Sequence, residues 1–253
     1  MGKIIAVSNQ KGGVGKTTTS VNLASALASL GKKVLLVDID PQGNSCSGLG
    51  VRLTEDQPSM YDILIEGADP ADIILPSAVP NLDLIPVNAD LSGATVVMTD
   101  LPEREYRLHK ALRPCAARYD YCIIDCPPSL DLLTINGLTA ADSVLIPIQC
   151  EYYALEGMVK LMKTIELVQN SLNPALTLEG VLLTMYDSRT NLSNQVAEEV
   201  TTYFKEKVFQ TIIPRAVKIS EAPSHGLPIN AYDPGGSGAR CYHNLAQEVV
   251  QHG

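Results

Sequence analysis

Short apolar runs alternate with longer segments of helical periodicity along most of the chain. Several of the short runs are continuously apolar, as parallel strands covered on both faces are. Strands that alternate with helices form right-handed βαβ units. The pattern therefore predicts an α/β fold: a doubly wound, mostly parallel sheet with helices on both faces. The expected strands are Lys3–Ser8, Lys33–Asp38, Leu82–Val87, Tyr121–Asp125, Ser143–Ile148, Glu179–Met185 and Val208–Ile213.

Two of the intervening segments carry strong helical signals. Thr17–Leu30 is rich in Ala and Leu, and Gly31 follows it at the position where a helix commonly ends. A second stripe of apolar residues at helical spacing predicts buried core rather than a binding groove. It consists of Ala154, Met158, Leu161, Met162, Ile165 and Val168. No linker, repeat or low-complexity segment interrupts the pattern, so we expect one domain over residues 1–253.

Composition narrows the class of protein. Hydrophobic residues make up 45% of the chain, which excludes a disordered protein. No apolar run approaches the roughly 20 residues that span a bilayer, and the first residues lack a signal-peptide pattern. We expect a cytoplasmic protein. Six cysteines without a C-x-x-C spacing are interpreted as ordinary thiols rather than metal ligands.

Charge is distributed unevenly along the chain. The net charge of -9 argues against a surface coated uniformly for nucleic acid. Residues 51–100 hold nine acidic residues against one base, Arg52. An ordinary solvated face explains that stretch better than a binding site for a basic peptide. Residues 186–240 instead hold six acidic and six basic residues, which permits a local basic surface in the C-terminal part.

The most informative stretch is SNQKGGVGKTT, residues 8–18, between the first expected strand and the first helix. Glycines there let backbone N–H groups converge on an anion, and the helix N-terminus favours negative charge. Lys16 would reach the β- and γ-phosphates of a nucleotide, and the Thr17 hydroxyl would complete the coordination of Mg²⁺. Gln10 replaces the first glycine of the usual phosphate-loop pattern, and a second lysine, Lys11, lies inside the loop. We therefore predict a phosphate loop of unusual type.

Three aspartates end apolar runs where open parallel sheets bind ligands. Asp38 and Asp40 follow the second expected strand, and Asp125 ends the fourth. Each could instead be a helix cap or a turn residue. Because phosphoryl transfer needs a carboxylate near Mg²⁺ and a group that orients water, the aspartates are candidates for those roles.

The loop with its extra lysine resembles the deviant Walker A motif of the ParA/MinD class of P-loop ATPases. The resemblance continues through KVLLVDIDPQG (Lys33–Gly43), YDYCIIDCPPS (Tyr119–Ser129), PIQCEYYALEG (Pro147–Gly157) and IPRAVKISEAPSHGLPI (Ile213–Ile229). It is strongest toward the chromosomal ParA (Soj) type and covers nearly the whole chain. The fold of that class agrees with the strand pattern.

The resemblance assigns roles at the nucleotide. Lys11, Lys16, Asp40 and Asp125 would be catalytic, with Asp40 orienting water and Asp125 in the Mg²⁺ shell. Asp38 would lie near the metal with Thr17. The family pattern places adenine on the backbone of Pro214 and Ala216; a proline-ended strand packed on the core is the alternative. ATP would be cradled by the loop residues Lys11, Gly12, Gly13, Val14, Gly15, Lys16, Thr17 and Thr18.

The resemblance also implies partners. Lys11 would cross a two-fold interface, so that ATP but not ADP drives homodimerisation, and Gly12 would let the two loops approach. Arg189, Arg215 and Lys218 match positions that bind double-stranded DNA without sequence preference. A ParB-type centromere-binding protein would accelerate hydrolysis. The expected function is chromosome or plasmid partitioning on the nucleoid.

Three alternatives remain from other classes of protein. A MinD-like membrane switch would end in a basic amphipathic helix, whereas Asn244–Gly253 has no lysine or arginine. A nitrogenase-reductase-like protein would need cysteines placed for an iron–sulfur cluster, which Cys126 alone does not supply. A tyrosine kinase of related fold would carry a tyrosine-rich tail. We therefore expect neither a membrane partner nor a metal cluster.

Overall fold

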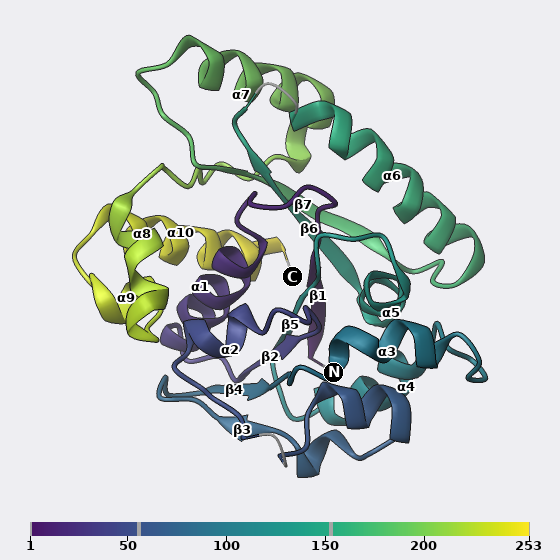
Figure 1. The fold of residues 1–253 in the computed structure, drawn as a ribbon. Helices are drawn as coiled ribbons and strands as arrows, with labels where there is room; N and C mark the ends of the chain where they lie inside the picture. Colours follow the sequence, from purple (N-terminus) through teal and green to yellow (C-terminus); the bar gives the residue numbers. More distant parts are fainter. Residues whose placement is uncertain (1, 55–56, 152–153, 253) are drawn as a thin grey trace.

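A seven-stranded sheet runs through the molecule in the order β3-β4-β2-β5-β1-β6-β7 (Figure 1). The computed structural model describes residues 2–54, 57–151 and 154–252. Neighbouring strands are parallel except for the short β3, which is antiparallel to β4. The strands are β1 (Lys3–Val7), β2 (Val34–Asp38), β3 (Leu75–Pro76), β4 (Leu82–Ile85), β5 (Tyr121–Asp125), β6 (Ser143–Gln149) and β7 (Thr177–Thr184). The predicted fold class is confirmed.

Helices cover both faces of the sheet, as the continuously apolar strands require. Figure 1 shows α1, α2 and α8–α10 on one side and α3–α6 on the other. The α-helices are α1 (Lys16–Ser29), α2 (Asn44–Gly48), α3 (Leu91–Met98), α4 (Arg107–Ala116), α5 (Leu132–Ala140), α6 (Ala154–Ser171), α7 (Asn191–Phe204), α8 (Val217–Glu221), α9 (Ile229–Tyr232) and α10 (Ser237–His252). Short helical turns are η1 (Asp62–Glu66), η2 (Pro70–Asp72), η3 (Lys205–Lys207) and η4 (Ala222–His225).

The first helix ends where its sequence predicts. Gly31 adopts φ +81°, and its N–H donates to Ala28 O at 3.0 Å. The N–H of Lys32 donates to Leu27 O at 3.3 Å. This pair of bonds is a Schellman motif, which satisfies helix carbonyls at a left-handed glycine. Gly31 thus fixes the end of α1.

The predicted strand Val208–Ile213 is wrong. The segment runs beside β7 but touches it only at intervals, through Phe209 N–H to Val181 O (3.0 Å) and Ile213 N–H to Leu183 O (2.9 Å). The segment thus advances four residues while β7 advances two. Between these contacts, the N–H groups of residues 210 and 211 donate to the Glu248 carboxylate of α10, each at 2.8 Å. The Glu248 side chain therefore takes the place of the backbone hydrogen bonds that would pair this segment with β7 as a strand.

The apolar stripe on α6 lies in the core, as predicted. Met158, Leu161, Ile165 and Val168 are buried, and Met162 is half-buried against the same core. The side chain of Ala154 lies outside the described residues, as do residues 152–153 of the motif Pro147–Gly157. The hydrophobic pattern thus predicts the buried face of this helix.

Candidate nucleotide site and basic rim

The carboxyl ends of β1, β2 and β5 meet at one edge of the sheet. β5 lies between the other two, and its last residue, Asp125, aligns with Asp38 on β2 and with Val7 on β1. The phosphate loop leaves β1 at this edge and enters α1. The topology therefore brings two of the three predicted aspartates beside the loop.

The phosphate loop takes a conformation that two of its glycines make possible. Gly13 has φ +74° and Gly15 has φ +89°, both left-handed. The side chain of Asn9 braces the start of the loop: its Nδ2 donates to Pro147 O (2.7 Å), and its Oδ1 accepts from Lys11 N–H (3.0 Å). The Thr184 hydroxyl at the end of β7 donates to Val14 O at 2.8 Å. Loop shape is thus set from β6 and β7 as well as by its own glycines.

Lys16 lies inside the loop with only 6% of its surface exposed. Its Nζ donates to Lys11 O at 3.0 Å. Among the described residues it has no carboxylate within ion-pair distance. Burial lowers the pKa of Lys16, whereas the charge of Asp125 raises it. A buried ammonium without a paired carboxylate favours an anionic ligand.

Asp125 is fully buried and surrounded by hydroxyl groups. Its Oδ1 lies 3.0 Å from Ser20 Oγ on α1, and its Oδ2 accepts from Ser45 Oγ on α2 at 2.8 Å. Burial raises the pKa of Asp125 to about 6, against the lowering effect of hydrogen bonds from Thr17, Ser45 and Ser20. The hydroxyl groups thus stabilise the negative charge of this carboxylate in the interior of the protein.

Asp38 and Asp40 form a compact turn behind this carboxylate. Asp38 Oδ1 accepts from Asp40 N–H at 3.0 Å, and Asp40 Oδ1 accepts from Gln42 N–H at 3.0 Å. The Cys46 thiol lies 3.6 Å from Asp38 Oδ2. Burial, followed by the charge of Asp125, raises the pKa of Asp38 well above its ordinary value. Asp38 has no exposed surface, whereas Asp40 is 6% exposed.

A cavity of about 420 Å³ opens beside the start of α1. Its walls include Gly15 and Thr18 from the loop and helix, together with Pro214 and Ala216, the predicted adenine contacts. The cavity therefore connects the predicted phosphate and base sites, although these come from opposite ends of the chain.

Within the described part of the chain, Lys11, unlike Lys16, contacts a carboxylate. Its Nζ lies 3.6 Å from Glu151 Oε2, and Arg215 Nη2 lies 3.7 Å from Glu151 Oε1. One carboxylate thus contacts both the second lysine of the loop and a cation of the predicted DNA surface. Neither contact is evident from sequence spacing, because Lys11, Glu151 and Arg215 lie in three separate segments.

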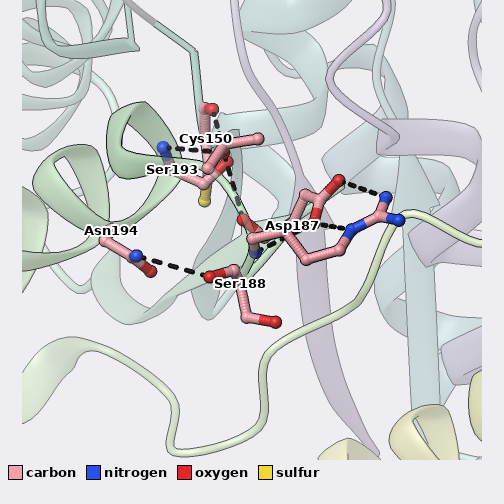
Figure 2. Close-up of polar contacts among 7 residues, drawn as sticks. Cys150, Asp187, Ser188, Ser193 and Asn194 are labelled. Carbon is pink, nitrogen blue, oxygen red and sulfur yellow. Dashed lines mark hydrogen bonds and ion pairs between the residues drawn. The ribbon is translucent and has the colours of Figure 1, made fainter.

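The remaining predicted DNA-binding cations also have acidic partners. Arg189, 86% exposed at its side chain, donates to both carboxylate oxygens of Asp187, at 2.8 and 2.7 Å. Figure 2 shows Asn194 of α7 donating to the carbonyl of Ser188, the residue that follows Asp187. The hydrogen bonds from Arg189 lower the pKa of Asp187 to about 2. On α8, Lys218 Nζ lies 3.2 Å from Glu221.

The predicted residues therefore gather in two adjoining places. The loop, Asp38, Asp40 and Asp125 meet at the sheet edge, and Arg189 and Arg215 both act on the Asp187 carboxylate. Sequence reasoning missed the supporting groups Asn9, Ser20, Ser45, Glu151 and Thr184. Asn9 and Glu151 lie within quoted motifs, but the sequence did not show their supporting roles, because these depend on contacts with residues far away in the chain.

All six cysteines are free, and five of them are buried. The described residues contain no group of three or more His, Cys, Asp and Glu side chains arranged to hold a metal ion on their own. Within the same residues, no helix is long and apolar enough to cross a membrane.

Comparisons with known proteins show to which family the chain belongs. A family model described as an AAA domain matches residues 2–178. The chain is 60% identical to the sporulation initiation inhibitor protein Soj of Bacillus subtilis, over 100% of this chain and 100% of that protein. It is 54% identical to the chromosome-partitioning ATPase Soj of Treponema pallidum, over 99% of this chain and 98% of that protein.

A solved structure agrees in fold. Cobyrinic acid a,c-diamide synthase from Mycobacterium smegmatis, with a bound ATP analogue and magnesium, has a TM-score of 0.88 at 37% identity. The match covers 100% of this chain and 96% of that protein. Full-length identity to the Soj proteins is far higher. The chain belongs to the ParA/MinD class of deviant Walker A ATPases, within its Soj/ParA branch.

Proposed function

We propose that this protein is a ParA-type partitioning ATPase that uses ATP and Mg²⁺ to switch between a free monomer and a DNA-bound dimer. The observation that carries the proposal is the contrast between the surroundings of its two loop lysines. Lys16 is buried and donates to the loop carbonyl of Lys11, whereas the partly exposed side chain of Lys11 contacts the carboxylate of Glu151. The first suits the phosphates of its own nucleotide, and the second suits those of a facing subunit.

The site fits a magnesium nucleotide by the chemistry of its donors. The buried Lys16 offers positive charge to the phosphates, and the left-handed glycines turn loop N–H groups toward them. Thr17 and Asp125 would hold the metal and its water shell, with Asp38 behind them. Bound Mg²⁺ would neutralise phosphate charge during transfer. An ATP analogue and magnesium in the Mycobacterium smegmatis relative support this assignment.

The remaining residues would prepare the reaction. Asp40, held in its turn by Asp38 and by Gln42 N–H, would orient the attacking water. Pro214 and Ala216 would hold adenine in the cavity beside Gly15. The roles of Val14 and Thr18 would be structural and phosphate-binding: Val14 O accepts the Thr184 hydroxyl, and Thr18 lines the cavity.

Gly12 supports a dimer independently of Lys11. A Cβ atom added to Gly12 meets nothing within 4 Å among the described residues, and its φ is not in the left-handed range. A single subunit therefore does not require glycine there. Glycine would be required at this position if the loop of a second subunit packed against it across a two-fold axis.

Dimerisation is tested by sedimentation with a non-hydrolysable ATP analogue and Mg²⁺. The wild-type protein should dimerise with the analogue and stay monomeric with ADP. Lys11→Ala and Gly12→Val should keep the fold by circular dichroism and remain monomeric with either nucleotide. Normal dimerisation of Lys11→Ala would refute the proposed role of that lysine.

Non-specific DNA binding would use Arg189, Arg215 and Lys218 of both subunits. Such binding is mostly counterion release, so a few phosphate contacts per dimer suffice despite the negative net charge. Each of the three cations already pairs with a carboxylate: Asp187, Glu151 or Glu221. DNA phosphates would have to displace these partners, which keeps the affinity of a monomer low.

DNA binding is tested by retention of the ATP-bound protein on duplex DNA at several salt concentrations. Arg189→Ala with Lys218→Ala should weaken retention and flatten its salt dependence. Asp187→Asn should strengthen retention because it frees the Arg189 guanidinium. Asp100→Asn, an exposed change of equal charge on another surface, is the control and should have little effect. An unchanged salt slope in the double variant would rule out this surface.

Hydrolysis would return monomers to solution, so the nucleotide would act as a timer. A ParB-type centromere-binding protein would shorten that time by stimulating hydrolysis on the nucleoid. The names of the Soj relatives, one of them a chromosome-partitioning ATPase, support this role. Phosphate release with DNA, with and without the ParB-type protein of the same organism, measures the stimulation.

A further inference from the structure

Met185 holds a left-handed backbone conformation beside the phosphate loop. Its φ is +51°, directly after β7 ends at Thr184. Only four non-glycine residues in the described part of the chain have positive φ: Asn81, Glu103, Met185 and Lys205. Such conformations are strained for an L-residue with a long side chain, and they persist where surrounding structure enforces them.

Both neighbours of Met185 are fixed by hydrogen bonds. Before it, the Thr184 hydroxyl donates to Val14 O in the phosphate loop at 2.8 Å. After it, the N–H of Tyr186 donates to Ile213 O (3.1 Å), and Tyr186 O accepts from Arg215 N–H (3.0 Å). The chain must therefore turn at Met185 between the loop and the segment 213–215. The turn decides where this side chain points.

The side chain of Met185 lines the 420 Å³ cavity together with Pro214 and Ala216. Its Cε lies 3.9 Å from the position that a Cβ on Gly15 would occupy, at the N-terminal end of α1. A thioether is polarizable, unbranched and suited to contact with an aromatic ring. Met185 therefore offers an apolar surface where the loop meets the predicted base site.

We propose that Met185 packs its thioether against the face of the adenine ring and thereby sets how deeply the nucleotide seats along the phosphate loop. The strained turn aims the side chain, and its Cε comes within contact distance of the Cβ position at Gly15. The inference rests on the adenine site proposed above and adds a base-contacting residue to it. Packing on a ring face contributes affinity for the base, not for the triphosphate.

The test compares the binding of two probes by calorimetry in the presence of Mg²⁺: ATP and inorganic tripolyphosphate. Met185→Gly should weaken ATP binding about five-fold and leave tripolyphosphate binding unchanged. Because glycine accepts the left-handed conformation freely, the nucleotide-free variant should melt at a higher temperature than wild type. Met185→Leu should keep ATP affinity within about two-fold, since most of the apolar contact survives.

Lys205→Gly is the matched control, because Lys205 has the same φ of +51° on an exposed turn. It should raise the melting temperature without changing the affinity for either probe. Unchanged ATP affinity in Met185→Gly, or an equal loss for both probes, would overturn the inference. The variant Ala216→Phe distinguishes a wrong role for Met185 from a wrong location of the adenine site. If ATP affinity also survives that bulky change, the base binds elsewhere.

Discussion

Asp125 combines complete burial with hydroxyl donors from two helices. Ser20 reaches it from α1 and Ser45 from α2, so the carboxylate also ties these helices to the end of β5. Burial opposes its charge and raises its pKa to about 6, while the hydroxyl bonds act the other way. At this single residue, the polarity needed by the site and the stability of the fold depend on the same contacts.

Removing one donor should therefore cost stability. Ser45→Ala leaves one oxygen of the buried carboxylate without its 2.8 Å hydrogen bond. We expect the free energy of unfolding without nucleotide to fall by about 2 kcal/mol, as measured by urea denaturation. Ser47→Ala, an exposed serine of the same helix, should change it by less than about 0.5 kcal/mol. Equal effects of the two variants would contradict the role assigned to Ser45.

At the scale of elements, the segment 208–215 lies beside β7 without becoming a strand. Phe209 fixes its position: a Cβ added to Gly180 of β7 would lie 2.5 Å from Cε2 of the Phe209 ring. The ring thus occupies the space that the glycine leaves open. This contact brings the following residues, including Pro214 and Ala216, to the cavity beside the phosphate loop.

Gly180→Ala should disrupt this edge of the sheet. We expect about 2 kcal/mol of lost stability in a urea unfolding measurement, because the ring must move away from β7. Gly93→Ala is the control: it lies on α3, where an added Cβ meets nothing within 4 Å among the described residues. Alanine there should stabilise the protein by up to about 1 kcal/mol through helix propensity. A Gly180→Ala protein as stable as wild type would argue against this packing.

Across the whole molecule, the sheet and its two helical layers bury nearly all the thiols. Burial raises the pKa of Cys46 to about 12 and that of Cys150 to about 11, and it also raises the pKa values of Cys122 and Cys126. The thiolate is the reactive form. At neutral pH the native protein therefore presents only the half-buried Cys241 to a reagent.

Alkylation measures this burial directly. Iodoacetamide at pH 7 should add at most one adduct to the native protein, at Cys241, by intact-mass analysis. In guanidinium chloride all six cysteines should react. Cys241→Ser should then remain unmodified when native. Rapid labelling of Cys46 or Cys126 in the native protein would mean that the nucleotide edge of the sheet opens readily.

Prediction succeeded where the signal is local and periodic. Short apolar runs predicted six of the strands, several of them continuously apolar, because burial on both faces constrains every position of a parallel strand. It failed at Val208–Ile213, where an apolar run lies beside the sheet but Glu248 takes its backbone donors. The sequence of the segment 208–213 gives no sign that the Glu248 carboxylate of α10 accepts its backbone N–H groups.

The sequence alone predicts the class of sheet, the end of α1 at Gly31 and the phosphate loop with its two lysines. Each of these features depends on residues that are neighbours in the sequence. Folding adds what distant segments do to one another. It joins Lys11 and Arg215 through Glu151, surrounds Asp125 with serines and turns Met185 toward the cavity. These contacts form only when parallel strands bring their carboxyl ends to a common edge, so no local pattern encodes them.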